Sequence, residues 1–179
     1  MEIDFTTIAY LKTGSTVQQQ VYQILTTHNI LEGLQDYNPV VVGTFPLDIA
    51  IETSDIDIAC SCKDIAAFQA KVRAHFKQYI GFTDLVFTLR TEQTYVANFV
   101  LDHVPIEIFA QTIPVAEQYG YRHMLIEHAI LLEQGDEFKA QVIALKRAGL
   151  KTEPAFATLL GLIGDPYESL LTYNRFNGQ

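Results

Sequence analysis

The chain has 179 residues, of which 49% are hydrophobic, so it can bury a sizeable core within one domain. Its formal net charge of −9 argues against binding nucleic acid through the phosphates, because such binding needs a basic surface. No apolar run approaches the roughly 18 residues of a membrane span. The first four residues contain two acids and no basic residue, whereas a signal peptide would begin with basic residues. We expect a cytoplasmic protein, with neither a membrane nor nucleic acid as partner.

The first long helix is predicted to begin at Ser15, which forms a capping-box pattern with Gln18, and to run to about Leu31. Its core-facing stripe has helical spacing and consists of Val17, Val21, Ile24, Leu25, His28 and Leu31. The run over 40–42 is short, apolar and β-branched, which is typical of a central strand. Gly43 ends this strand, and residues 45–51 are expected to form either a short helix or an irregular connector.

Polar and apolar residues alternate over residues 54–60, which predicts a strand with one acidic face. Asp55 and Asp57 project from the same side, whereas Ile56 and Ile58 point to a core. Two neighbouring carboxylates repel each other, so we expect a partner cation between them. Cys60 and Cys62 follow, too close in the chain for an ordinary disulfide, and we expect them to be buried or half-buried thiols.

A second amphipathic helix is predicted to begin after Asp64 and to end before Gly81. Its apolar stripe consists of Ile65, Phe68, Val72, Phe76 and Tyr79. Strands are predicted over 84–90, 95–101 and 104–110, and the two residues at 102–103 indicate a tight hairpin that sets Asn98 opposite Glu107. Pro105 indicates that part of the last strand is an edge or a bulge.

Beyond Pro114 the composition becomes helical. Helices are predicted over 115–134 and 136–148, each followed by a glycine, and two more begin at residue 152 and after Asp165. The predicted fold class is α+β, a small mixed β-sheet flanked by helices with a helical C-terminal segment. We expect residues 1–112 to form the α/β core, with residues 113–179 packed on it as one compact unit.

Glu107 adds a third acid on a strand next to the one that carries Asp55 and Asp57. Such a set of oxygen ligands is the kind that holds one or two magnesium ions, with manganese as an alternative. A glycine turn lets backbone N–H groups approach phosphate oxygens, so Gly43 and Thr44 are the candidate phosphate-binding residues. The sequence thus points to metal-dependent phosphoryl or nucleotidyl transfer.

Gly43-Thr44, ten intervening residues, Asp55-Ile56-Asp57 and the later Glu107 together resemble the signature of the polymerase-β-type nucleotidyltransferase superfamily. More closely, five segments resemble the bacterial family called domain of unknown function 4269, which is grouped with that superfamily. These segments are Gly43-Thr44-Phe45-Pro46, Ser54-Asp55-Ile56-Asp57-Ile58, Tyr121-Arg122-His123-Met124, Lys151-Thr152-Glu153-Pro154-Ala155-Phe156-Ala157 and Gly164-Asp165-Pro166-Tyr167. The resemblance covers nearly the whole chain and implies a nucleotidyltransferase-like fold.

The resemblance implies that Asp55, Asp57 and Glu107 are catalytic metal ligands. It also implies that Gly43 and Thr44, with the neighbouring Ser54, bind the substrate. The arginine often found a few residues after the glycine turn is absent here, and Pro46, Leu47 and Asp48 occupy that region. Positive charge for a triphosphate is therefore expected from Arg122, Lys146 and Lys151, of which Arg122 and Lys151 lie in family-like segments.

The leading hypothesis is a magnesium-dependent nucleotidyltransferase that moves a nucleoside monophosphate from a nucleoside triphosphate to a hydroxyl of a small molecule or protein. The alternative is a catalytically inactive relative that binds a ligand or partner, as a regulator or antitoxin-like protein would. Tailoring of nucleic acid is disfavoured by the net charge. His123 and Glu127 lie four residues apart on a predicted helix, but without a third ligand they do not indicate a zinc site.

Overall fold

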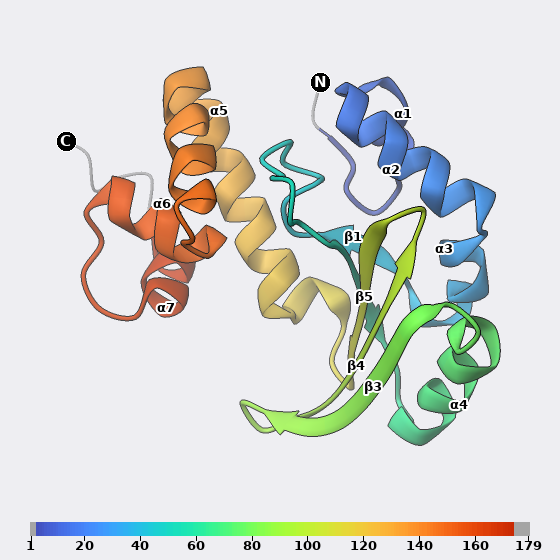
Figure 1. Ribbon diagram of the computed structural model, residues 1–179. Coiled ribbons are helices and arrows are strands. Elements are labelled where there is room, and N and C mark those ends of the chain that lie inside the picture. Colours follow the sequence, from blue (N-terminus) through green and yellow to red (C-terminus); the bar gives the residue numbers. More distant parts are fainter. Residues whose placement is uncertain (1–2, 174–179) are drawn as a thin grey trace.

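Five strands form one mixed sheet, with helices packed on both of its faces (Figure 1). The computed structural model describes residues 3–173; residues 1–2 and 174–179, which carry part of the predicted acidic N-terminus and of the predicted helical segment, lie outside the described range. The strands are β1 (Val40–Val42), β2 (Ile56–Ser61), β3 (Ile80–Leu89), β4 (Glu92–Leu101) and β5 (Val104–Gln111). Their order is β1-β2-β5-β4-β3, with β2 and β5 parallel and the other neighbours antiparallel. The predicted fold class is confirmed.

The helices form two groups at opposite sides of the sheet (Figure 1). One group precedes β3 in the chain and contains α1 (Ala9–Thr13), α2 (Thr16–Thr27), α3 (Ile30–Gly33) and α4 (Ile65–Phe76). The other group follows β5 and contains α5 (Tyr119–Arg147), α6 (Thr152–Leu160) and α7 (Pro166–Leu171). Short 3-10 helices cover Gln35–Tyr37 and Val115–Glu117. Within residues 3–173, no helix is long and apolar enough to cross a membrane.

Alternation along β2 assigns its side chains to two cores. Ile56 and Ile58 are fully buried against helices α2 to α4, as predicted. Ala59 faces the other core, which is built with the helices after β5. Asp57 shares this second face, so the acidic side of the strand is turned toward α5 and α6.

The first long helix and the first strand differ from their predicted form. Asn29 takes a left-handed conformation with φ 51°, so α2 ends at Thr27 and a separate α3 begins at Ile30. Val17, predicted to face the core, is 45% exposed. The prediction that β1 is central is wrong, because β1 is an edge strand. Its three valines are all buried since each face of the strand is covered by a different core, which produces the same apolar pattern.

The β4–β5 hairpin has the predicted register. Asp102 and His103 have φ of 47° and 68°, as a two-residue turn requires, and Asn98 lies opposite Glu107. β5 as a whole lies between β2 and β4, but β2 pairs with it only from Ile106 onward, so the part that contains Pro105 has a strand neighbour on one side only, as predicted. Proline has no N–H to donate, and the nitrogen of Pro105 lies on the side of β5 that faces away from β4. Pro105 is tolerated because β2 does not pair with β5 at this position.

The helical half follows the glycine and cap signals. Gly135 has φ 78° and ψ −169° within α5, so two straight stretches meet there, near the predicted boundary. The Asp165 carboxylate accepts hydrogen bonds from the backbone N–H groups of Tyr167 and Glu168, which confirms the predicted cap of α7. The division into a core of residues 1–112 and a packed segment of residues 113–179 stays a prediction.

The loop between β1 and β2 is fastened to helices on both sides, and no helix forms over 45–51. Asp48 has φ 55° and points away from the sheet acids: it accepts hydrogen bonds from Ser15 Oγ at 2.6 Å and from Lys139 Nζ at 2.7 Å. Gln18, whose capping box with Ser15 is confirmed, donates to the carbonyl oxygen of Phe45 at 2.9 Å. These contacts hold the glycine turn in place relative to β2.

Removing the Asp48 side chain should loosen this attachment. We expect Asp48→Ala to lower the free energy of unfolding by about 1–3 kcal/mol, because two donors lose their acceptor and alanine disfavours positive φ. Asp48→Asn should cost less, because asparagine tolerates that φ and keeps an oxygen for Ser15. Urea denaturation measures both variants, with the exposed Asp36→Asn as control. Equal stability of Asp48→Ala and the wild type would contradict an anchoring role.

Candidate functional site

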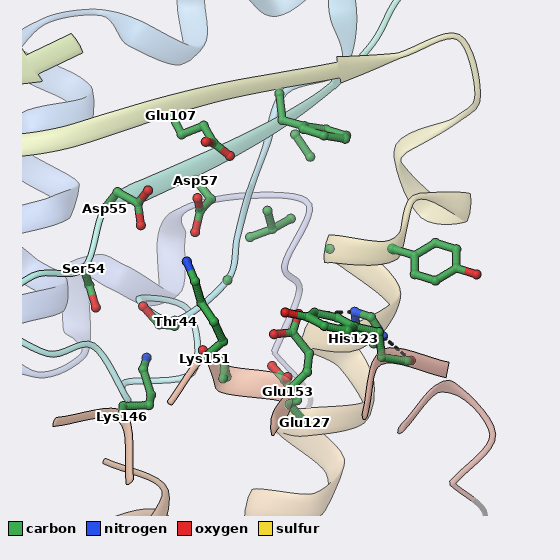
Figure 2. Close-up of a pocket in the computed structure, with 18 of the residues that line it drawn as sticks. Thr44, Ser54, Asp55, Asp57, Glu107, His123, Glu127, Lys146, Lys151 and Glu153 are labelled. Carbon is green, nitrogen blue, oxygen red and sulfur yellow. Dashed lines mark hydrogen bonds and ion pairs between the residues drawn. The ribbon is translucent and has the colours of Figure 1, made fainter. Parts of the chain in front are cut away.

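A cavity of about 670 Å³ opens between the sheet and the second helix group (Figure 2). This volume is in the range of small-molecule sites. Its walls come from the β1–β2 loop, β2, β5, the β3–β4 turn, α5 and α6. Eight of the residues predicted from the sequence line this one cavity: Gly43, Thr44, Ser54, Asp55, Asp57, Glu107, Lys146 and Lys151.

The three predicted acids converge on one side of the cavity (Figure 2). Asp57 and Glu107 are direct partners in the parallel pairing of β2 with β5. Asp55 lies one residue before β2 begins, on the same face as Asp57. Within residues 3–173, no group donates a hydrogen bond to any of the three carboxylates. Their oxygens are therefore available to a ligand.

Burial and mutual repulsion perturb these acids. The pKa of Asp57 lies well above its usual value, because burial disfavours the charge and because Asp55 and Glu107 are close. The pKa of Glu107 is also raised, by burial and then by Asp55, while Lys151 acts in the opposite direction. A cation at this position would relieve the repulsion and favour the charged carboxylates.

Gly43 permits the close approach of the turn to the acidic strand. Val42 pairs with Asp57, and Gly43 follows with φ 77°. A Cβ atom at position 43 would lie 2.3 Å from Asp57 Oδ2, so a side chain there would push the carboxylate aside. Beyond this turn, the loop returns to β2 through Ser54, whose Oγ accepts a hydrogen bond from the Ile51 N–H at 2.9 Å. The glycine turn and the acids are thus one structural unit.

The donor set suits a hard divalent cation, since it offers carboxylate oxygens without other partners. As the side chains stand, however, the described residues contain no group of three His, Cys, Asp or Glu side chains placed to hold a metal ion together. A shared ion would require the carboxylates of Asp55, Asp57 and Glu107 to draw closer than they lie in this structure.

Two of the three predicted basic residues reach the cavity. The Lys151 side chain extends toward the acids in Figure 2. Lys146 is buried, and its Nζ donates to the Ile49 carbonyl oxygen at 2.9 Å; burial lowers its pKa to about 8, although Glu127 and Asp57 act in the opposite direction. Arg122 is exposed and does not line the cavity. His123, the next residue on the helix, takes the inward position instead.

Arg90 at the β3–β4 turn lines the cavity and was not singled out by the sequence analysis. Its guanidinium carbon lies 4.1 Å from the centroid of the Tyr119 ring, and the guanidinium pairs with Glu168. The Tyr119 hydroxyl donates to the same carboxylate at 3.2 Å. No local sequence signal marks this contact, because it depends on how far the long β3–β4 hairpin reaches toward α7.

A second acidic group lies deeper, where α5 meets α6. His123 Nε2 is 2.9 Å from the Tyr167 carbonyl oxygen, which can only accept, so this nitrogen carries a hydrogen; Nδ1 lies 3.4 Å from Glu153 Oε1. His123 thus contacts Glu153 and Tyr167. Glu127 is 3% exposed, and its Oε1 has no hydrogen-bond partner. Burial, followed by repulsion from Glu153, raises the pKa of Glu127 well above its usual value.

Glu127 should therefore make the protein less stable as the pH rises. Because its pKa is raised in the folded state, its favourable protonated form is fully present below the unfolded pKa and is lost as the pH rises toward the folded value. We expect Glu127→Gln to raise the melting temperature at pH 7.5 and to have little effect near pH 4.5, with exposed Glu133→Gln as control. Thermal unfolding across this pH range measures the difference. A wild type that is more stable than Glu127→Gln at pH 7.5 would mean that the carboxylate has a favourable partner.

Solved structures with the same fold are nucleotidyltransferases of the polymerase-β type. The GLD-2/RNP-8 complex matches with a TM-score of 0.52 and 12% identity, over 80% of this chain and 56% of that chain. Cid1 poly(U) polymerase with MgGTP bound matches with a TM-score of 0.50 and 13% identity, over 74% and 42%. A Cid1 structure described for its RNA terminal uridylyl transferase activity matches with a TM-score of 0.51 and 12% identity, over 72% and 40%.

These likenesses show the fold alone, and the chain spans only about half of the length of those proteins or less. A comparison with curated proteins finds no match. The family model described as "Domain of unknown function (DUF4269)" matches residues 23–173. Because this match includes most of the sequence and the whole cavity, the chain belongs to the DUF4269 family.

Proposed function

We propose that this protein is a magnesium-dependent nucleotidyltransferase that moves a nucleoside monophosphate from a nucleoside triphosphate to a hydroxyl of a small molecule or protein. The observation that carries the proposal is the juxtaposition of Asp57 and Glu107 across β2 and β5, beside Asp55, without any donor among the described residues. The nucleotidyltransferase fold supports it, as does the MgGTP bound to one of the similar structures.

In this proposal Asp55, Asp57 and Glu107 hold one or two magnesium ions, for which manganese can substitute. Bound there, the metal would supply charge stabilisation to the reacting phosphate and to the leaving pyrophosphate. The backbone N–H groups at Gly43 and Thr44 bind phosphate oxygens, with the Ser54 hydroxyl nearby. Lys151 is the cation that we assign to the triphosphate in place of the absent arginine, because its side chain already extends toward the acids.

The reaction exchanges one phosphorus–oxygen bond for another. The acceptor hydroxyl oxygen forms a bond to the α-phosphorus, and the bond from that phosphorus to the bridging oxygen breaks, so pyrophosphate leaves with the electron pair. The hydroxyl proton passes to a carboxylate, for which we propose Glu107. A carboxylate within hydrogen-bond reach of the acceptor hydroxyl can take this role.

Metal-dependent nucleotide binding tests this proposal. We expect at least one of ATP, GTP, CTP and UTP to bind with Mg²⁺ or Mn²⁺ and not with EDTA, as measured by calorimetry. Asp55→Asn/Asp57→Asn should weaken this binding by tenfold or more, because charged ligand contacts contribute about 1.5–3 kcal/mol each. Exposed Asp36→Asn is the control. If none of the four nucleotides binds the wild type, or if EDTA has no effect on binding, the magnesium–nucleotide proposal is wrong.

Lys151 should contribute mainly to triphosphate binding. We expect Lys151→Gln to weaken binding of the magnesium nucleotide by about tenfold, as loss of one charge-assisted contact predicts, and to weaken its dependence on salt. Lys151→Arg should retain much of the affinity, because the charge is kept. The exposed Lys63→Gln is a matched control, and calorimetry at two salt concentrations measures all three. Equal losses in Lys151→Gln and Lys63→Gln would show only a general charge effect.

The second candidate is a catalytically inactive protein of the same fold that binds a ligand or a partner. Two observations favour it: the three acids are not drawn together as a ligand set, and the arginine of the superfamily pattern is missing at residues 46–48. Pyrophosphate release distinguishes the candidates. Nucleotide binding that is independent of metal, with no pyrophosphate released in the presence of hydroxyl acceptors, would support the inactive protein.

A further inference from the structure

The cavity is lined by buried acceptor atoms that have no hydrogen-bond donor. Three buried side-chain polar atoms in residues 3–173 lack a hydrogen-bond partner, and two of them, Gln118 Oε1 and Glu127 Oε1, belong to residues that line this cavity. Native proteins rarely leave buried polar atoms without a hydrogen bond, so each of these atoms is a candidate acceptor for a ligand.

The orientation of the Gln118 amide is fixed by its surroundings. Its Nε2 donates to the carbonyl oxygens of Cys60 at 2.8 Å and Ile113 at 3.2 Å. If the amide were flipped, Oε1 would face these two carbonyl oxygens, and none of the three atoms could donate. Oε1 is therefore the atom left without a partner. When it is ionised, the Glu127 carboxylate likewise has acceptors and no donor. A ligand that donates hydrogen bonds would therefore satisfy either group.

The negative charge where α5 meets α6 is only partly compensated. Glu153 lies close enough to Glu127 to raise the pKa of Glu127, whereas Lys146 acts in the opposite direction. The Lys146 ammonium donates its hydrogen bond to the Ile49 carbonyl oxygen rather than to either carboxylate. In the described residues, the one basic side chain within 4 Å of either carboxylate is His123, whose Nδ1 lies 3.4 Å from Glu153 Oε1 and which carries a charge only when protonated. Arg90 on the cavity rim is already paired with Glu168. A cationic ligand would remove this excess of negative charge.

We propose that Glu127 and Glu153 bind the ammonium group of the acceptor, so that the acceptor is an amino alcohol whose hydroxyl receives the nucleotide. The hydroxyl part of this inference rests on the proposed function, whereas the ammonium site does not. An ammonium group supplies positive charge and three donors, which the carboxylate oxygens of Glu127 and Glu153 can accept. A neutral nucleobase edge would supply donors but would leave the buried carboxylates uncompensated.

A matched pair of small probes tests the ammonium site. 2-Aminoethanol and ethane-1,2-diol differ by one amino group in place of a hydroxyl. In ¹H–¹⁵N NMR titrations we expect 2-aminoethanol, and not the diol, to shift the amide signals around residues 118–127 and 152–154. Glu127→Gln and Glu153→Gln should each weaken this binding by about tenfold, since a charge-assisted bond is lost. Glu133→Gln, an exposed acid on the same helix, should leave it unchanged.

Equal responses to the two probes, or none to 2-aminoethanol, would overturn the inference. So would a Glu127→Gln variant that keeps the amine affinity and instead loses magnesium–nucleotide binding, because Glu127 would then face the nucleotide. The wild type's magnesium–nucleotide titration separates this inference from the proposed function. Amine binding that depends on Glu127, without nucleotide binding, would leave the ammonium site standing and the nucleotidyltransferase proposal refuted.

Discussion

The parallel pairing of β2 with β5 is the constraint on which the site depends. It sets Asp57 directly opposite Glu107, with Asp55 two residues earlier on the same face. Both carboxylates are partly removed from water, and the pKa of each is raised, so the pairing works against stability. Strands that keep like charges side by side without donors store unfavourable free energy that a cation can release on binding. The fold itself is secured elsewhere, by the apolar residues that alternate with these acids on the same two strands.

The second half of α5 positions the other side of the site. Lys139, Lys146 and Arg147 lie on one face of this helix and hold Asp48, the Ile49 carbonyl oxygen and Glu52 of the β1–β2 loop. The acid at position 48 would repel a triphosphate if it pointed into the cavity. Its contacts with Ser15 and Lys139 direct it away, so the carboxylate that departs from the superfamily pattern acts as an anchor for the glycine turn.

Local signals predicted those parts of the fold that local chemistry determines. The capping box at Ser15, the hairpin turn at residues 102–103 and the break at Gly135 each follow from a few neighbouring residues, and all three are present. Strand order is a tertiary property: an edge strand covered on both faces, such as β1, has the same apolar pattern as a central strand. The acids of the site were found because period-two alternation fixes their face. Arg90 was missed, and Arg122 was placed at the site, because neither the reach of a hairpin nor the rotation of a helix against a sheet is encoded in a short segment.

The two ends of the cavity differ in chemistry, which suggests that one binds the nucleotide and the other binds the acceptor. The sheet acids and the glycine turn lie on the strands and at the start of the β1–β2 loop, where we propose that a nucleotide binds with its metal. The other end is built from α5 and α6, which lie outside the sheet and contribute Glu127 and Glu153. Because this end offers acceptors and negative charge, it selects against phosphate groups and for cations. The shared strands would then fix the kind of reaction, while the helices of this family would determine which acceptor is modified.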